Sequence, residues 1–311
     1  MIHYLTHSQI DKARWDDCIG RSLNRRVYAF SWYLDIVCPG WDALVEEDYR
    51  CVFPLTQYRK WGISYLAQPY FAQQLGIFSG EVIPEDRVVE FIGAIPRKYR
   101  FTEIHLNSEN RFTGGPDETT FRVNHVLGIS SSSLEMTGNY AQNTRRNIRK
   151  AEESGIGISR IADVDLLIDL FRENFGRKEG KLKAVHYATL RQLLLHCIGG
   201  NRGYILGANS KTGSLSAAAF FLFDNSRVYY LFAASAPEAR ENGAMFLLID
   251  RFIAENTGKG LTLDFEGGND PNLGRFYKSF GAVEEPYATL KIDRLLPLTR
   301  RAVNFVRRLR K

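Results

Sequence analysis

The fold is decided by the stretch between residues 203 and 292, which contains GYILGA (203–208), LSAAAFFLF (215–223), RVYYLFAA (227–234), LTLDFE (261–266) and YATLKI (287–292). Each segment is apolar or alternating, and turn residues separate one from the next, which is typical of β-strands. A helix is predicted between the third and fourth strands, and its apolar face is made by Met245, Leu248, Ile249, Phe252 and Ile253. A second, short helix is predicted over 272–280.

Strands followed by a crossover helix and a further strand make an α/β pattern. The first half of the chain repeats this order more weakly, with a helix beginning near Asp86 and strands predicted at 43–47, 51–57, 63–66 and 101–106. With 311 residues, the chain is about twice the length of a common domain. The sequence therefore predicts two α/β domains of one fold in tandem.

A segment rich in Gly, Ser and Thr, residues 110–138, is interpreted as the boundary between these domains. The predicted domains are 1–125 and 126–293, followed by a tail at 294–311. That tail holds six arginines, one lysine and no acid, although the net charge of the whole chain is only +6. The body of the protein is therefore close to neutral, and the basic character is local.

Composition places the chain among ordinary globular proteins, with 44% hydrophobic and 24% charged residues. No apolar run approaches the roughly 18 to 20 residues of a spanning helix, and the first residues lack the pattern of a secretory signal. The four cysteines are widely spaced, which favours free thiols over a disulfide framework or a zinc site. We expect a cytoplasmic protein that needs no metal.

Several short motifs resemble those of the GNAT acyltransferases. Arg240–Ala244 (RENGA) looks like the loop that binds the pyrophosphate of coenzyme A, although Met245 stands where a second small residue is usual. The stretch 276–282 (FYKSFGA) looks like the family's tyrosine-containing ending. Across the chain, the Fem-type branch with two GNAT-like halves is more similar, on the evidence of QPYFAQQLGIF (68–78), NTRRNIRKA (143–151) and DFEG (264–267).

This resemblance implies two GNAT-like domains with mixed central sheets and an N-acyl or aminoacyl transferase. An activated acyl group would pass from acyl-CoA or aminoacyl-tRNA to an amine acceptor. Well-studied Fem members use aminoacyl-tRNA and a peptidoglycan precursor peptide, so a cell-wall or envelope precursor is one expected acceptor. The alternative is a non-catalytic ligand-binding or membrane-peripheral protein on an inherited fold.

The donor-binding hypothesis rests on Arg240, Gly243 and Ala244, at the start of the best-patterned helix. Backbone N–H groups at a helix N-terminus suit a diphosphate. The alternative is that Gly243 serves only packing. By resemblance, Tyr277 is the general acid that protonates the leaving group, and a phenol with a pKa of about 10 suits that task. Its alternative role is that of a core tyrosine.

Asp264 and Glu266 are two apart in a predicted strand, so their side chains should share one side. Glu266, at the strand end beside two glycines, is the better candidate for the general base that deprotonates the acceptor amine. The alternative for both carboxylates is loop capping or ion pairing.

Two further groups are candidates for substrate binding. The first is a basic turn on a polar helix, able to clamp a carboxylate or phosphate, made by Arg145, Arg146, Arg149 and Lys150. The second is a loop of amides and a ring suited to a peptide or sugar-like ligand, made by Gln68, Tyr70, Gln73 and Gln74. Their alternatives are a solvated helix face and a packed loop.

The tail at 294–311 interleaves apolar and basic residues, as a basic amphipathic helix would. Contact with an anionic membrane at the inner face is one hypothesis, because each cation near such a surface contributes about 1 kcal/mol. Packing of its apolar side on the body and binding of tRNA phosphates are the alternatives.

Overall fold

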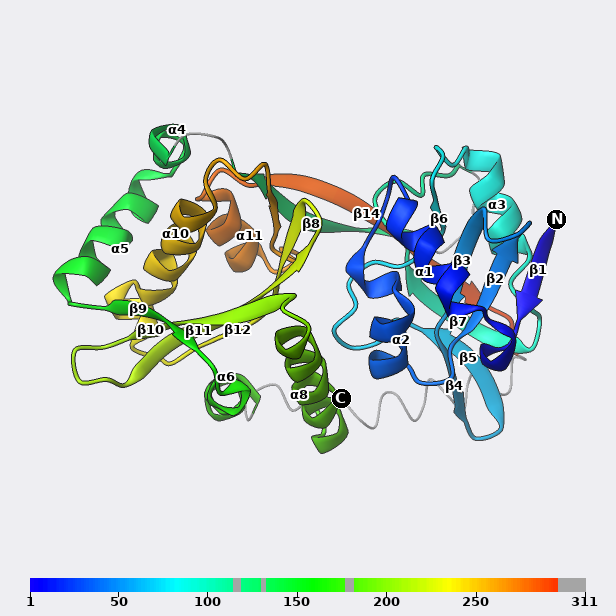
Figure 1. Ribbon diagram of the computed structural model, residues 1–311, viewed down its shortest axis with the longest axis horizontal. Coiled ribbons are helices and arrows are strands. Elements are labelled where there is room, and N and C mark those ends of the chain that lie inside the picture. The colour runs from blue at the N-terminus through cyan, green and yellow to red at the C-terminus, as the bar shows by residue number, and fades with distance from the viewer. Residues whose placement is uncertain (114–118, 130–132, 177–181, 296–311) are drawn as a thin grey trace. The chain divides into compact units, whose positions relative to one another are not determined.

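The computed structural model describes residues 1–113, 119–129, 133–176 and 182–295. Its contacts divide the chain into two compact units: Met1–Arg122 with the described residues from Pro286, and Val123–Glu285 (Figure 1). Strand β14 (Val283–Asp293) carries the chain from the second unit back into the first. Most of the basic tail, residues 296–311, lies outside the described residues, so the membrane hypothesis stays a prediction.

The second unit is built on strands whose order in the sheet differs from their order in the chain. Four strands pair antiparallel, each with the next in chain order: β9 (Gly157–Ile161), β10 (Gly203–Asn209), β11 (Leu215–Asp224) and β12 (Arg227–Ser235). β13 (Thr262–Asp264) joins β12 in parallel, and β8 (Thr120–Gly128) pairs antiparallel with β13. The predicted α/β class is confirmed.

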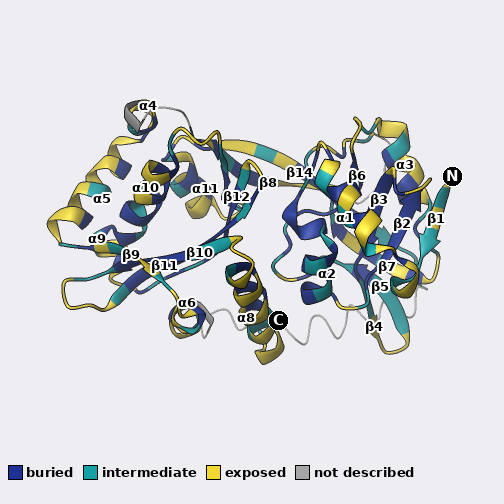
Figure 2. Cartoon of the chain, viewed as in Figure 1, coloured by how far each residue is buried: buried dark blue, intermediate teal, exposed yellow. Residues whose placement is uncertain are grey.

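Helices cover both faces of this sheet (Figure 1). On one face lie α5 (Gln142–Glu153), α9 (Ala239–Asn242), α10 (Ala244–Asn256) and α11 (Pro271–Lys278). On the other lie α6 (Val164–Phe171), followed by the turn Arg172–Gly176, and α8 (Ala184–Gly199). The central strands β10, β11 and β12 are mostly buried between these layers (Figure 2), and Phe221 of β11 stacks on Phe252 of α10 with ring centroids 3.8 Å apart. The short helix α4 (Ser133–Gly138) precedes α5.

The parallel pair β12–β13 is short, and this shapes the unit. Arg227–Tyr229 pair with Thr262–Asp264, after which β12 continues to Ser235 while the chain after Asp264 turns away. We call this divergence the fork; Tyr230–Ser235 form one side of it and Phe265 and Glu266 the other. The predicted strand over 261–266 is therefore too long, because Glu266 has a φ of +53° that a strand does not adopt.

A buried ion network lies where the paired part of the fork ends. Arg227 donates from Nε to Asp264 Oδ2 and from Nη2 to Glu285 Oε2, each at 2.8 Å. Asn124 of β8 donates to the other oxygen of Asp264 at 2.8 Å. The Asp264 side chain is only 1% exposed, so its charge depends on these partners.

The first unit has two sheets. One has the order β1 (Ile2–Leu5), β2 (Asp42–Glu46), β3 (Cys51–Leu55) and β6 (Phe78–Ser79). The other joins β4 (Gln57–Lys60), β5 (Ile63–Ala67), β7 (Tyr99–His105) and the end of β14. Its helices are α1 (Lys12–Arg21), α2 (Ser31–Val37) and α3 (Glu85–Gly93), with two short 3₁₀ turns, His7–Gln9 and Val27–Ala29.

The parallel pair β5–β7 of the first unit does not open as β12–β13 does. Gln68 donates its N–H to Glu103 O, and its side-chain oxygen accepts the N–H of His105 at 3.0 Å. Leu75 then donates to His105 O at 2.8 Å. The loop after β5 thus continues the pairing along β7.

Several strands were not predicted, and β8 and β9 are the two of them that belong to the second unit. β8 lies inside the segment 110–138 that was interpreted as a linker, because its turn-forming residues surround a strand that is half polar. β9, with the sequence GISRI, lacks clean alternation and is stabilised by pairing with β10.

We expect Arg227→Met to lower the free energy of unfolding by about 3–5 kcal/mol, because it leaves the carboxylates of Asp264 and Glu285 without their cation in a buried site. The matched control is Arg191→Met, which breaks the exposed pair with Asp165 and should change the free energy of unfolding far less, because solvent screens that pair. Urea unfolding measures both, and equal losses would contradict the network's importance.

A second expectation concerns acid. Burial, with a contribution from Arg122, lowers the pKa of His105 from 6.5 to about 4. The unfolded chain therefore takes up this proton at higher pH than the folded chain, so the free energy of unfolding falls as the pH drops from 6.5 to 4. His105→Phe should flatten this slope in urea titrations across that range. An unchanged slope would assign the acid sensitivity to other groups.

Candidate functional site

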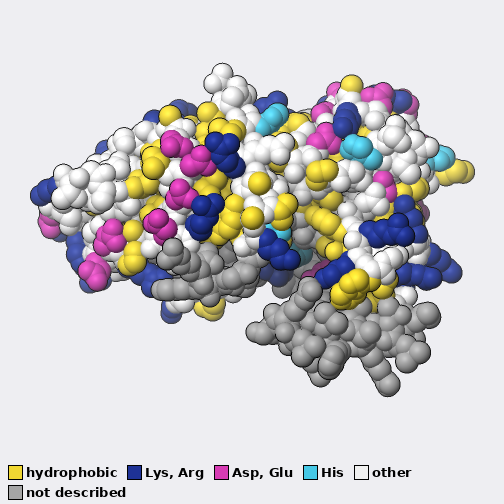
Figure 3. Space-filling model, turned by 90° about the horizontal axis from the view of Figure 1, so that it is seen from below, with side chains coloured by type: hydrophobic (Ala, Val, Ile, Leu, Met, Phe, Trp, Pro, Cys, Tyr) yellow, Lys and Arg dark blue, Asp and Glu magenta, His cyan; other side chains and the backbone are white. Residues whose placement is uncertain are grey.

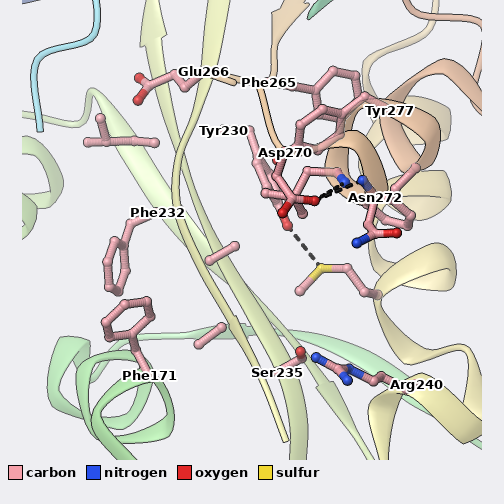
Figure 4. Close-up of a pocket in the computed structure, with 16 residues that line it drawn as sticks. Phe171, Tyr230, Phe232, Ser235, Arg240, Phe265, Glu266, Asp270, Asn272 and Tyr277 are labelled. Atoms are coloured by element: carbon pink, nitrogen blue, oxygen red, sulfur yellow. Dashed lines mark hydrogen bonds between the residues drawn. The ribbon is translucent and has the colours of Figure 1, made fainter. Parts of the chain in front are cut away.

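The fork opens a pocket of about 590 Å³ (Figure 4). It is lined by the free part of β12, the turn after β13 and side chains of α6, α9, α10 and α11. The lining residues are Phe171, Tyr230, Leu231, Phe232, Ala233, Ala234, Ser235, Arg240, Met245, Phe265, Glu266, Asp270, Asn272, Leu273, Phe276 and Tyr277. Most of this surface is apolar, with a few polar groups, which is the usual character of a ligand pocket.

A β-bulge makes the pocket accessible to both faces of the sheet. Phe220 of β11 pairs with Phe232, whereas the next residue, Phe221, pairs with Tyr230, so Leu231 is the extra residue. Without it, Tyr230 and Phe232 would point to the same face. Instead, Tyr230 reaches α10, where its hydroxyl donates to Met245 Sδ at 3.1 Å, and the Phe232 ring packs on Phe171 of α6, with centroids 4.8 Å apart.

Tyr277 is held on the α10–α11 side. Asp270 caps α11 by accepting the N–H groups of Asn272 and Leu273 (Figure 4), and Pro271 opens the helix. The Tyr277 ring stacks on Phe265 with centroids 4.4 Å apart. Burial raises the pKa of this phenol well above 10, and the charges of Glu266 and Asp270 add to the effect. Tyr277 therefore stays protonated at neutral pH.

Glu266 lies on the other side of the pocket from Tyr277. Its carboxylate extends away from the Tyr277 ring, toward the side of the sheet where Phe171 and Phe232 lie (Figure 4). The prediction that Asp264 and Glu266 share one side is wrong, because the strand ends at Asp264 and Glu266 is left-handed. Asp264 is instead buried against Arg227, so only Glu266 is in the pocket.

The three predicted donor-binding residues differ in their surroundings. Arg240 of α9 lines the pocket near Ser235 (Figure 4). Gly243, with a φ of +73°, lies so close to α5 that a Cβ would stand 2.3 Å from Asn147 O. Its N–H donates to Ala239 O at 3.2 Å, and that of Ala244 donates to Asn242 Oδ1 at 2.9 Å. Gly243 therefore has a packing role, and both amides already have partners.

The basic turn of α5 is exposed and lies outside the pocket lining. Arg145, Arg146, Arg149 and Lys150 are on the solvent side of the helix, opposite Thr144 and Ala151. Arg146 donates to Asn143 Oδ1 at 2.8 Å. Because α5 contacts α9, this turn belongs to the same side of the unit as Arg240.

The amide loop belongs to the first unit. Gln68 is bound to His105 N and donates to Ala72 O, while the buried Gln74 accepts the N–H of Ser108 and donates to Gln73 Oε1. Tyr70 is 48% exposed. The amides of Gln68 and Gln74 thus stabilise the loop beside β7, and Tyr70 is the member that is accessible to a ligand.

Sequence reasoning missed Tyr230, Phe171 and Phe232 as site residues, because their strand and helix look like ordinary core. It also missed Asp270, although the pair Asp270–Pro271 is a recognisable helix start. The lower face of the second unit, where α6 and α8 lie, carries side chains of both charges (Figure 3). The exposed ion pairs Arg172–Asp169 and Arg191–Asp165 come from this region.

The four cysteines are free, as the sequence predicts, and all four are buried. Among the residues that the structure describes, no three His, Cys, Asp or Glu side chains gather in a metal-binding group. None of the helices in the described segments has the length and apolar character needed to cross a bilayer.

The comparisons with known proteins agree with the geometry. Residues 138–279 match the family described as acetyltransferase (GNAT) domain. The structure is similar to the crystal structure of FemX, with 13% identity, a TM-score of 0.62 and coverage of 97% of this chain and 99% of that one. No curated protein matches the sequence.

Two further solved structures share the fold. A tandem GNAT protein from the clavulanic acid biosynthesis pathway is 12% identical, with a TM-score of 0.52 and coverage of 94% and 98%. The C-terminal domain of a putative lysylphosphatidylglycerol synthetase from Agrobacterium fabrum is 11% identical, with a TM-score of 0.54 and coverage of 90% and 91%. The predicted resemblance is confirmed: residues 138–279 match the GNAT acetyltransferase domain family, in a chain with the fold of the tandem, Fem-like GNAT proteins.

Proposed function

We propose that the chain transfers an activated acyl or aminoacyl group to an amine, and that the transfer takes place in the fork between β12 and β13. The observation that carries this proposal is that the pocket has a phenol on one side of the sheet and a carboxylate on the other. A donor held against α10 and α11 and an acceptor arriving beside α6 would meet at the fork.

The acceptor step needs a free amine. Glu266 takes a proton from the ammonium group, directly or through water, and the amine nitrogen then attacks the acyl carbonyl carbon. A new C–N bond forms as the bond from that carbon to the carrier breaks. The nitrogen then loses one further proton to solvent, and the released amide keeps a single N–H.

The leaving group is protonated by Tyr277. Because the pKa of this phenol lies above its usual 10, proton transfer to a thiolate, whose conjugate acid has a pKa of about 8.5, is uphill. Transfer to the more basic alkoxide released from an ester is favoured. The phenolate then regains a proton from water. This match supports an ester donor, such as aminoacyl-tRNA, over acyl-CoA.

The carrier's phosphates offer a second argument for the same donor. A coenzyme A diphosphate would need N–H groups at the start of α10, but those of Gly243 and Ala244 are occupied. Arg240 and the exposed turn of Arg145, Arg146 and Lys150 instead offer dispersed cations on one side of the unit. Such a surface suits the phosphate backbone of a nucleic acid. For the acceptor, we propose an amine of a cell-envelope precursor.

The function is tested by incubating the protein with a panel of aminoacyl-tRNAs or acyl-CoAs and with amine acceptors, and by detecting the amide product by mass spectrometry. Turnover with aminoacyl-tRNA is expected. Turnover with acyl-CoA alone would overturn the donor assignment but keep the transferase, and no product with any donor would overturn both.

For Tyr277→Phe we expect kcat to fall by about 10²–10⁴-fold with an unchanged donor KM, because only the proton donor is lost while the ring keeps its stacking on Phe265. Steady-state kinetics measure this. With an activated aryl ester as donor, the Tyr277→Phe variant should regain much of its rate, because an aryloxide can leave without being protonated. Wild-type turnover in the variant would leave Tyr277 a packing residue.

For Glu266→Gln we expect a loss of kcat in the same range, largest at low pH where the acceptor amine is most fully protonated. Raising the pH should narrow the gap, since a pre-deprotonated amine no longer needs the base. The comparison is a pH–rate profile of the two proteins. A constant ratio of their rates across the profile would argue that Glu266 does not act as a base.

A further inference from the structure

Side chains of β8 bind the backbone of the turn that contains Glu266. These hydrogen bonds take the place of the strand pairing that ends at Asp264. Asn124 accepts the N–H of Gly267 on its Oδ1 at 2.9 Å, and His125 Nδ1 lies 2.9 Å from Gly267 O. Both backbone groups of the residue after Glu266 are thus bound by two consecutive residues. Because a carbonyl only accepts, His125 carries its hydrogen on Nδ1.

Residues of the turn also bind the backbone of β8. Asn269 accepts the N–H of Val123 at 3.0 Å and donates to Val123 O at 3.3 Å. Phe265 N donates to His125 O at 3.0 Å. The turn therefore runs beside β8 with side-chain amides and an imidazole standing in for strand pairing, which lets Glu266 keep its left-handed φ of +53°.

His125 also touches the helix of the proposed acid. Its ring lies 5.9 Å from that of Tyr277, and a Cβ on Gly268 would stand 2.0 Å from its Nδ1. The imidazole thus fills the space between the Glu266 turn and α11. A shift of this ring would therefore displace both the turn that contains Glu266 and the helix α11 that contains Tyr277.

Packing alone does not account for an imidazole here. The side chain is 1% exposed, and among the described residues its Nε2 is buried without a hydrogen-bond partner. Burying such an atom without a partner lowers stability, and a phenylalanine ring of similar shape would avoid this loss. The histidine is explained if the bond from Nδ1 to Gly267 is what the site requires.

We propose that Asn124 and His125 are positioning residues that hold the Glu266 carboxylate at the fork through both backbone groups of Gly267. This inference rests on the proposed role of Glu266 as the base. Neither residue contacts the reacting atoms in this account; each acts through the turn.

The test is a double-mutant cycle. His125→Phe keeps the ring beside Tyr277 and removes the Nδ1 donor, so we expect kcat to fall by about 10²-fold, the effect of a displacement near 1 Å, with donor KM unchanged. In a Glu266→Gln background the same change should cost little, because there is no base left to position. His125→Asn, which restores a donor near the Nδ1 position, should recover most of the rate.

Stability and function are separated by controls. Leu193→Ala, in α8, is a buried core change that lowers stability without touching the fork, and its kcat should match the wild type at the assay temperature. Hydrogen exchange supplies a readout independent of activity: the Gly267 amide should exchange slowly in the wild type and quickly in Asn124→Ala.

The outcomes are distinct. An equal loss from His125→Phe with and without Glu266, or a Gly267 amide that exchanges freely in the wild type, would overturn the positioning role while the transferase stands. A Glu266→Gln enzyme with wild-type kinetics would instead overturn the proposed base and the positioning inference together.

Discussion

The second unit depends on the parting of two parallel strands. Only three residues of β13 pair with β12, and the ladder stops where Asp264 is buried against Arg227. Beyond this point one edge of β12 has no neighbouring strand among the described residues, and the pocket occupies that place. The ion network thus lies at the end of the ladder, and the pocket begins with the next residue of each strand, Tyr230 and Phe265.

The bulge at Leu231 opens the pocket to both faces of the sheet. An extra residue on β12 directs Tyr230 and Phe232 to opposite faces, so groups from α10 and α11 and from α6 border one cavity. In acyl transfer the acceptor amine must reach the carbonyl carbon of the bound donor without colliding with the rest of the donor. An opening through the sheet lets the donor bind on one face and the acceptor approach from the other. β-Bulges commonly re-aim side chains beside active sites for this reason.

In the first unit the corresponding parallel pair of strands does not open into a pocket. This pair, β5–β7, is continued by the loop after β5, in which Gln68 and Leu75 bind both backbone groups of His105. The loop fills the place that the pocket occupies in the second unit. This explains why amides that look like ligand-binding groups in the sequence are already bound, and why the proposed chemistry belongs to the second half.

Much of the fold follows from the sequence, because the segments between 203 and 292 have clear periods and turn residues between them. Tyr277 and Glu266 could be identified from their motifs. The bulge, the occupied amides of Gly243 and Ala244, and the role of Asn124 and His125 could not. Each depends on which distant segment lies beside it, and the residues 110–138 that contain β8 resemble a linker when read alone.

The most direct test of acyl transfer at the fork is a crystal structure with a stable donor analogue, in which an amide replaces the ester of an aminoacyl-adenosine. We expect the acyl carbonyl to lie between the free edge of β12 and Glu266, with the leaving atom beside the Tyr277 hydroxyl. An analogue bound in the first unit, or on the second unit away from the β12–β13 opening, would contradict it.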